Sequence, residues 1–229
     1  MSATFAISQH LFRRAAIVTV VVGSLLAILS PAPAEAAGQR SISPALAEMA
    51  VQALDAIENL NAVDDTQSND RYPLGFTRYA RYVGLRDEAA SLAAAELGVP
   101  AEMLRDAWSS TDLDKQTALL AALSQLGVPY RSNRSDPGVG FDCSGLTAYA
   151  WGVAGYELAR QSRTQINDSM RLDRQAARAG DLMYYPGHVM IFLGIGDAMV
   201  HSPQSGSEVE ITFLTERHSR HVVFADPTL

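Results

Sequence analysis

Apolar residues at helical spacing mark the first part of the chain. In 43–63 they recur every three or four positions, and Ser43-Pro44 is a suitable helix start. The polar run 64–71 is expected to be a linker. Two shorter helices are expected at 86–97 and 101–108, on either side of a Gly-Val-Pro turn. Such a pair can form a DNA-binding helix-turn-helix, but in this acidic chain a small helical packing unit is favoured.

Two further helical patterns open the second half of the chain. The first is capped by Ser110 or Thr111, carries a leucine-rich stripe and ends at Gly127, a residue type common just after a helix. The second begins at Cys143, with Asp142 as its N-cap. Its apolar stripe is expected to consist of Leu146, Tyr149, Ala150 and Val153.

Short strand-like segments fill the rest of the chain. They are expected at 181–185, 189–193, 198–201, 209–212 and 222–225. Helices followed by consecutive strands predict an α+β fold, in which the helix at Cys143 packs on an antiparallel β-meander. Glu208 and Glu210 alternate on the fourth strand and are expected to face solvent. His218 and His221 are expected to be surface or strand residues.

The second and third predicted strands are separated by a Gly-Ile-Gly-Asp turn. If they pair as a tight antiparallel hairpin around Ile195-Gly196, the numbers of opposed residues sum to 391. Met190 then faces His201, and His188 points to the same face as a diagonal neighbour, about 7–8 Å away. A slip of one residue would put the two histidines on opposite faces. This register therefore brings His188 and His201 together.

Residues 1–36 have the features of a secretory signal peptide. Arg13-Arg14 precede fifteen uncharged residues, and a small-residue cleavage motif ends at Ala36. The alternative is an uncleaved anchor, although about 20 apolar residues are needed to span a bilayer. We expect cleavage near Ala36 and a mature chain without a stable membrane span. A helical segment would occupy 37–110 and a second domain 111–229.

The charge of the chain limits its partners. It has 18 basic and 25 acidic residues, and removal of residues 1–36 changes the net charge from −7 to −8. This argues against nucleic acid as a partner, and any binding of anionic wall polymers must come from a shaped cleft. No phosphate-binding glycine loop occurs, and the histidines lack metal-ligand spacing, so neither metal nor other cofactor is expected. The sequence does not predict the oligomeric state.

Cys143 is the single cysteine of the sequence, so it cannot form an internal disulfide. It can be a buried filler, an intermolecular link or a reactive thiol. A helix start favours the thiolate, which is the nucleophilic form. Together with the histidine hairpin this suggests that Cys143 attacks a carbonyl, His188 takes the proton and His201 orients His188. Cys143 is then expected to alkylate well below the free-thiol pKa of about 8.5.

Residues 112–226 resemble the NlpC-type family of papain-like bacterial cell-wall cysteine peptidases. The matching segments, in order, are LGVPY at 126–130, FDCSGL at 141–146, LARQS at 158–162 and AGDL at 179–182, followed by the histidine hairpin. The resemblance implies a papain-like α+β domain with the catalytic triad Cys143, His188 and His201.

The resemblance also implies a set of residues that contact the substrate. Those given oxyanion or substrate-binding roles are Tyr130, Asp142, Ser144, Arg160 and Ser162. Replacement of Arg160 by alanine is expected mainly to weaken substrate use and to leave thiol reactivity intact. The segment RSNRSDPG at 131–138 departs from the family's aliphatic-Trp-Gly-Gly run, and this change affects the expected wall of the cleft.

The expected function is that of a secreted peptidoglycan endopeptidase. The resemblance implies hydrolysis of stem peptides at the γ-D-glutamyl–diaminopimelate bond. One alternative is a non-catalytic peptidoglycan-binding module, against which the presence of Cys143, His188 and His201 argues. The other is an amidase or transpeptidase acting on a different acyl substrate, an option that the unusual 131–138 segment keeps open.

Overall fold

The computed structural model of the chain describes residues 44–61 and 74–229. The predicted signal peptide with its cleavage site, and the predicted linker at 64–71, lie outside the described residues. Within the described part, no helix combines the length and the apolar character that crossing a membrane requires. These residues fall within one compact unit, 40–229.

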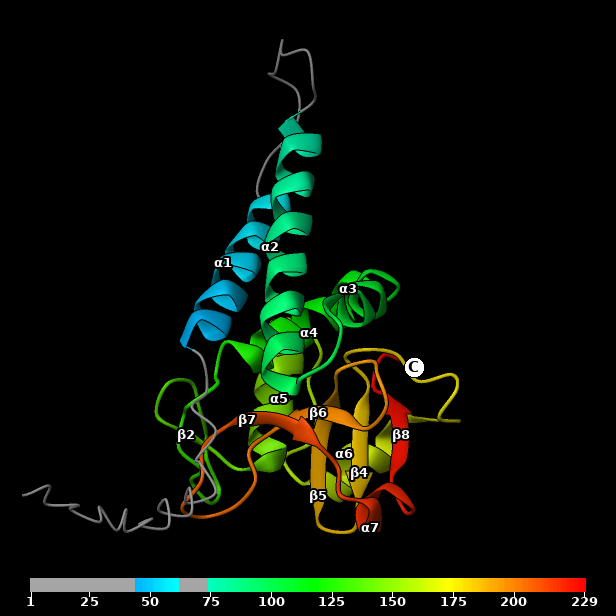
Figure 1. Ribbon diagram of the computed structural model, residues 1–229. Coiled ribbons are helices and arrows are strands. Elements are labelled where there is room, and N and C mark those ends of the chain that lie inside the picture. The colour runs from blue at the N-terminus through cyan, green and yellow to red at the C-terminus, as the bar shows by residue number, and fades with distance from the viewer. Residues whose placement is uncertain (1–43, 62–73) are drawn as a thin grey trace, which may run out of the picture. The chain divides into compact units, whose positions relative to one another are not determined.

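Three helices form the first part of this unit: α1 (Pro44–Asn61), α2 (Leu74–Leu97) and α3 (Ala101–Ser109). Helices α1 and α2 lie side by side (Figure 1). The predictions for α1 and α3 are confirmed, whereas α2 begins at Leu74 and not at residue 86. Tertiary packing supports its additional turns, because the Tyr82 side chain is fully buried and its hydroxyl donates a hydrogen bond to Oε1 of Gln116.

Helix α4 (Leu113–Leu123) connects this helical part to the rest of the fold. The predicted cap at Ser110 or Thr111 is wrong, since Asp112 occupies the N-cap position. The Thr111 hydroxyl instead donates to the carbonyl of Ala179, 3.1 Å away, and so ties the start of α4 to the segment before β4 (Leu182–Tyr185). The predicted helix end at Gly127 is also wrong, because α4 ends at Leu123 with Ser124 as its C-cap, and Gly127, with φ of 81°, belongs to the turn that follows.

Helix α5 (Cys143–Val153) packs against both α4 and the sheet. Asp142 is its N-cap as predicted, and Oδ1 of Asp142 accepts the Gly145 N–H at 2.8 Å. The predicted apolar stripe is partly wrong, because Val153 is exposed while Trp151 is fully buried. Because α5 is packed on two sides, a wider part of its surface is buried than the single predicted apolar stripe would cover.

The strands form a six-stranded antiparallel sheet of order β3-β8-β4-β5-β6-β7. All five predicted strands are present within one residue at each end, and two further elements, α6 (Ser162–Asp168) and α7 (Glu216–Ser219), flank them. The strands are β3 (Met170–Leu172), β4, β5 (His188–Phe192), β6 (Ala198–His201), β7 (Glu210–Phe213) and β8 (Val223–Asp226). A separate two-stranded ribbon contains β1 (Ser135–Asp136) and β2 (Gly140–Phe141).

The last strand does not continue the predicted meander. Strands β4 to β7 follow one another in the sheet, but β8 returns to the far side of β4, where Phe224 pairs with Met183. This position buries Phe224 and Ala225 of β8, and β8 also pairs with the short strand β3, which the sequence pattern did not predict.

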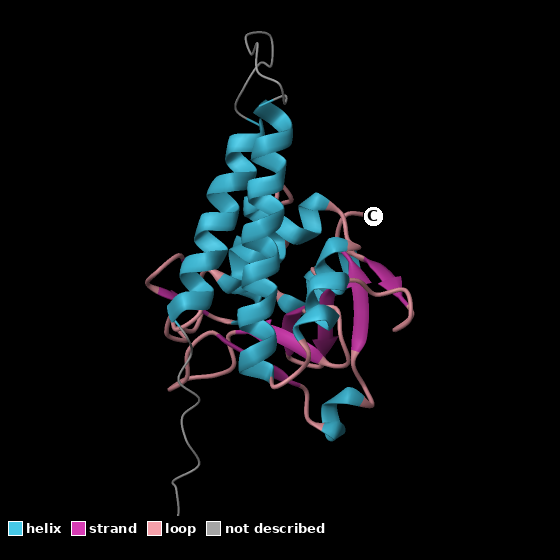
Figure 2. Ribbon diagram, turned by 45° about the horizontal axis from the view of Figure 1, so that its top comes forward, coloured by secondary structure: helices cyan, strands magenta, loops and turns pink. Residues whose placement is uncertain are grey.

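Side chains alternate between two apolar clusters on the two faces of the sheet. Val189 and Ile191 belong to a large cluster shared with helices α1 to α5, whereas Met190 and Phe192 join a smaller cluster with Phe224. Helices and sheet form the two layers visible in Figure 2. Because α1 and α2 contribute to the large cluster, the helical segment and the sheet share one core. The proposed division near residue 110 remains a prediction.

A buried ion cluster ties α4 to the edge of the core. Nζ of Lys115 lies 2.7 Å from Asp181 and 2.6 Å from Asp226, and all three residues are buried. Burial raises the pKa of Asp181, while the Lys115 and Thr228 hydrogen bonds outweigh burial and lower the pKa of Asp226. The cluster connects α4 to β8 and to Asp181, the residue directly before β4.

Candidate active site

Cys143 is the first residue of α5 and is partly buried. The Asp142 side chain fixes this helix start, because its two oxygens accept the backbone N–H groups of Gly145 and Asn133, each at 2.8 Å. A Cβ atom at Gly145 would overlap with the carbonyl oxygen of Arg134, so glycine permits the loop to lie directly on the first turn. The helix start that carries the thiol is therefore fixed by contacts to the chain on both sides of it.

The β5–β6 hairpin carries both predicted histidines. Ile191 pairs with Val200 and Phe192 with Met199, which confirms the predicted register. Nε2 of His188 lies 2.8 Å from Nδ1 of His201, and the two rings meet edge to face. Both histidines are buried. The sequence pattern therefore placed the two side chains correctly relative to each other.

A second contact places the hairpin beside the start of α5. Ser202, directly after β6, is fully buried, and its hydroxyl donates to the carbonyl of Phe141 at 2.8 Å. Phe141 is two residues before Cys143, and Ser202 is next to His201. In addition, the backbone N–H of Val189, the residue after His188, acts on the Cys143 thiol and favours its anion. The thiol thus lies beside the backbone N–H of the residue that follows His188, where α5 packs on β5.

Burial controls the charge states of the Cys143 thiol and the His188 imidazole. It raises the pKa of the Cys143 thiol, and this effect exceeds that of the N–H groups of Val189 and Ser144. It also lowers the pKa of His188 to about 3, with His201 and His218 adding to the effect. In the free protein both groups are therefore neutral at pH 7, which reverses the sequence-based expectation of a preformed thiolate.

We expect Cys143 to alkylate more slowly than a free thiol at pH 7 and to react fully only above pH about 8.5. The reason is that a raised thiol pKa moves thiolate formation to higher pH. Iodoacetamide labelling measured by mass spectrometry from pH 5 to pH 10 tests this, and Cys143, the single cysteine, gives the entire signal. A midpoint well below pH 8 would instead indicate a preformed thiolate–imidazolium pair.

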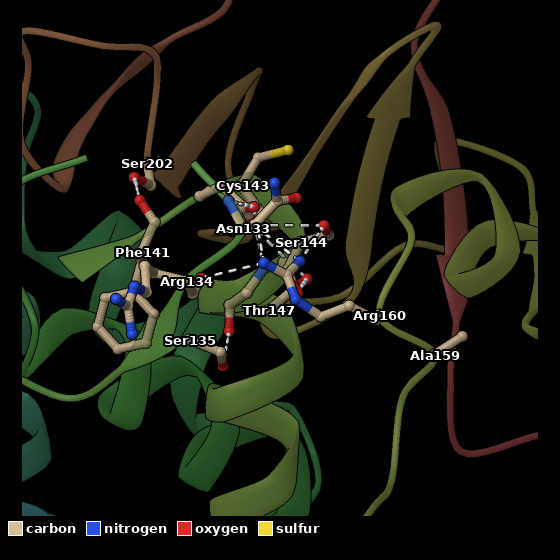
Figure 3. A network of polar contacts seen from close by, with 12 residues as sticks. Asn133, Arg134, Ser135, Phe141, Cys143, Ser144, Thr147, Ala159, Arg160 and Ser202 are labelled. Atoms are coloured by element: carbon tan, nitrogen blue, oxygen red, sulfur yellow. Dashed lines mark hydrogen bonds and ion pairs between the residues drawn. The ribbon is translucent and has the colours of Figure 1, made fainter. Parts of the chain in front are cut away.

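Arg160 binds the same aspartate that caps α5. Its Nη1 and Nη2 atoms donate to the two Asp142 oxygens at 2.9 and 2.7 Å. Nη1 also donates to the Ser144 hydroxyl at 3.0 Å, and Nη2 to the Arg134 carbonyl at 3.3 Å. Figure 3 shows the guanidinium at the helix start, while the Cys143 sulfur points away from it. The guanidinium is thus already engaged by the protein's own groups.

Tyr130 and Ser162, the remaining predicted site residues, differ in their contacts with the site. Tyr130 pairs with Phe141 in an isolated bridge, and burial, Asp142 and Cys143 raise the pKa of its phenol, which therefore stays protonated. Ser162 is the first residue of α6, and among the described residues its hydroxyl has no hydrogen bond to the Asp142–Arg160 network. The structure therefore brings Tyr130 to the site but does not join Ser162 to this network.

Gln165 has a larger part in the site architecture than the sequence indicated. It is buried, its Oε1 accepts the Thr147 hydroxyl at 2.7 Å, and its Nε2 donates to the carbonyls of Ser144 and Ala159. These bonds join the first turn of α5 to the segment that carries Arg160. Because both bonded carbonyls belong to the main chain, no side-chain pattern in the sequence revealed the connection.

Two residues expected on the surface also border the site. His218 of α7 stacks on Tyr185, with ring centroids 4.2 Å apart, and Tyr185 in turn lies 5.3 Å from the His188 ring. Glu210 was expected to face solvent, yet its Oε1 lies 3.4 Å from Nε2 of His201. His221 is exposed as predicted. The contact of Glu210 depends on the pairing of β6 with β7, and that of His218 depends on the position of α7. The local sequence predicts neither of these arrangements.

The unusual 131–138 segment contains strand β1 and leads into the turn before β2. Asn133 has a positive φ of 58°, and Arg134 makes a surface ion pair with Asp136 at 3.0 Å. A cavity of about 580 Å³ lies beside this ribbon along α5, lined among others by Ser135 and Leu158. Neither Cys143 nor the histidines line it, so it is separate from the reactive groups.

Known proteins are similar to this chain over the region that contains Cys143 and the two histidines. The model of the NlpC/P60 family matches residues 127–226. Peptidoglycan endopeptidase RipB of Mycobacterium tuberculosis is 31% identical over 224 residues, which cover 86% of this chain and 88% of that protein. Murein DD-endopeptidase MepH of Escherichia coli is 32% identical over 121 residues, which cover 48% of this chain and 44% of that protein.

Among the solved structures that are similar to this chain, one covers just under half of it. It is that of an NlpC/P60 family protein from Bacillus cereus, with 29% identity and a TM-score of 0.44, and it covers 48% of this chain and 39% of that one. The chain spans less than half the length of MepH and of dipeptidyl-peptidase 6 from Lysinibacillus sphaericus. Since the match to RipB extends over most of both proteins and the family model spans the Cys143–His201 region, this chain belongs to the NlpC/P60 family.

Proposed function

We propose that the protein is a cysteine peptidase that hydrolyses the stem peptides of peptidoglycan. The observation that carries this proposal is the arrangement at the end of the β5–β6 hairpin. There the Cys143 thiol lies beside the backbone N–H that follows His188, and His188 contacts His201 at 2.8 Å. The relatives RipB and MepH are named as a peptidoglycan endopeptidase and a murein DD-endopeptidase, and CwlT of Bacillus subtilis as a bifunctional muramidase/DL-endopeptidase, which supports the substrate class.

The proposed reaction uses the neutral pair. His188 takes the thiol proton as Sγ of Cys143 attacks the carbonyl carbon of the scissile amide. The protonated Tyr130 phenol is the proposed donor to the oxyanion that forms. His188 then gives its proton to the leaving amine, and a thioester remains on Cys143. A water molecule, deprotonated by His188, attacks the thioester, and the carboxylic acid and the free thiol are released.

The proposed scissile bond is the γ-D-glutamyl–diaminopimelate bond. A supporting relative is the γ-D-glutamyl-L-lysine dipeptidyl-peptidase of Bacillus subtilis, which is 33% identical over 99 residues. That protein is named for a γ-D-glutamyl bond to another diamino acid. MepH is named as a DD-endopeptidase, so the two relatives point to different bonds, and a cut at the DD cross-link is the principal competing outcome.

The test uses protein recovered from the exported fraction of producing cells. Its N-terminal sequence is expected to begin near Ala37, and an intact Met1 on membrane-bound protein contradicts the export part of the proposal. The purified protein is incubated with a defined cross-linked muropeptide, and both products are identified by mass spectrometry. The Cys143→Ala protein, prepared in the same way, is the control for contaminating hydrolases.

A fragment that begins at diaminopimelate supports the proposed bond. A cut at the DD cross-link keeps the peptidase proposal and overturns the bond assignment. Cleavage of the sugar–alanine amide supports the amidase alternative. Intact muropeptide together with retained binding supports the non-catalytic alternative.

A further inference from the structure

Glu210 lies on the strand next to the histidine hairpin. In the β6–β7 ladder its direct partner is His201, and its Oε1 is 3.4 Å from Nε2 of the His201 ring. The His201 side chain is only 9% exposed, whereas that of Glu210 is 41% exposed. The carboxylate therefore lies on the solvent side of the His201 ring and contacts the ring nitrogen that His188 does not use.

The order of these contacts defines where the protons lie. Nε2 of His188 is occupied by Nδ1 of His201, so Nδ1 of His188 is the nitrogen left to take a proton from Cys143. A neutral His188 with a free Nδ1 carries its hydrogen on Nε2 and donates it to His201. Nδ1 of His201 must then be an acceptor, and its single hydrogen lies on Nε2. The group facing that hydrogen is the Glu210 carboxylate.

We propose that Glu210 is a positioning residue that holds His201 in the Nε2–H tautomer and thereby keeps His188 ready as a base. The proposal rests on the proposed function, because it concerns the same reaction. A carboxylate accepts hydrogen bonds and cannot donate one, so it excludes the opposite tautomer of His201. When His188 becomes protonated, the negative charge of Glu210 also stabilises the positive charge on the histidine pair.

The first test measures the tautomer directly and needs no substrate. In the full chain labelled with ¹⁵N-histidine at pH 7, two-bond ¹H–¹⁵N spectra distinguish Nδ1–H from Nε2–H, and a His201→Gln protein assigns the signal. We expect His201 to be in the Nε2–H form in the wild type and in a mixture of forms in Glu210→Ala. Glu208→Gln is the matched control, because it removes the same charge from an exposed residue two positions earlier.

The second test is steady-state kinetics on the muropeptide. Glu210→Ala is expected to lower kcat by about tenfold with little change in KM, because a hydrogen bond to a charged group that is partly exposed has a modest effect. Glu210→Gln should lie between wild type and Glu210→Ala, since an amide oxygen can accept the bond but carries no charge. Glu208→Gln should match the wild type.

These readouts separate the proposal from the proposed function. If Glu210→Ala leaves the His201 tautomer unchanged, the positioning role is overturned whatever the activity. If the tautomer changes but kcat does not, the control of the tautomer stands and the role of Glu210 in the reaction is overturned. If the wild type cleaves no muropeptide while the tautomer still depends on Glu210, the proposed function fails and the control of His201 by Glu210 stands.

Discussion

Replacement of Cys143 by alanine is expected to abolish stem-peptide cleavage, and replacement of His188 by glutamine to lower kcat roughly 10²-fold to 10⁴-fold. The first variant removes the proposed nucleophile, and the second removes the group that takes and returns its proton. Glutamine fills most of the space that His188 leaves and avoids a large cavity at a buried position. The measurement is kcat and KM for the defined muropeptide.

The controls for this prediction come from the same chain. His221→Gln alters an exposed histidine outside the site and should retain wild-type activity. His201→Ala should retain measurable residual activity, because His201 orients the base without receiving the thiol proton. Thermal unfolding of each variant shows whether it is folded. A folded Cys143→Ala protein with wild-type turnover would contradict the proposed mechanism.

The sequence predicted the N-cap of α5 and the register of the histidine hairpin correctly, because short-range rules determine both. Asp142 at the N-cap depends only on its neighbours in the chain. The β5–β6 register follows from a short turn, and the pairing of Ile191 with Val200 agrees with it. Once that register is defined, the alternation of a strand places His188 and His201 on the same face. None of these steps requires knowledge of distant parts of the chain.

The surroundings of the reactive centre could not be predicted because they depend on longer connections. The loop 202–209 between β6 and β7 is too long for its turn to define a register, so the pairing of Glu210 with His201 was not predictable. The return of β8 to β4 likewise depends on which strand edge buries Phe224 best. Burial also determines the charge state of Cys143. The position of Cys143 at a helix start predicted a thiolate, whereas burial raises the pKa of the thiol and keeps it neutral.

Arg160→Ala is expected to lower both kcat and the alkylation rate of Cys143, and not only to weaken substrate binding. The contacts of Arg160 change the sequence-based expectation, because both of its terminal nitrogens are bonded to Asp142, which caps α5. The guanidinium is 43% exposed, so solvent weakens the ion pair, and we expect a loss of unfolding free energy of about 1 kcal/mol. The main effect is therefore on the position of the helix start.

A double-mutant cycle distinguishes this role from direct contact with the substrate. We compare Arg160→Ala, Asp142→Asn and the double variant by kcat, KM and the alkylation rate, with Arg163→Ala on the exposed side of α6 as the control. If Arg160 acts through Asp142, the double variant should be no worse than the more severe single variant. Arg160→Lys should resemble Arg160→Ala, because lysine cannot form the bidentate contact. Additive effects, a raised KM and an unchanged alkylation rate would instead assign Arg160 to the substrate.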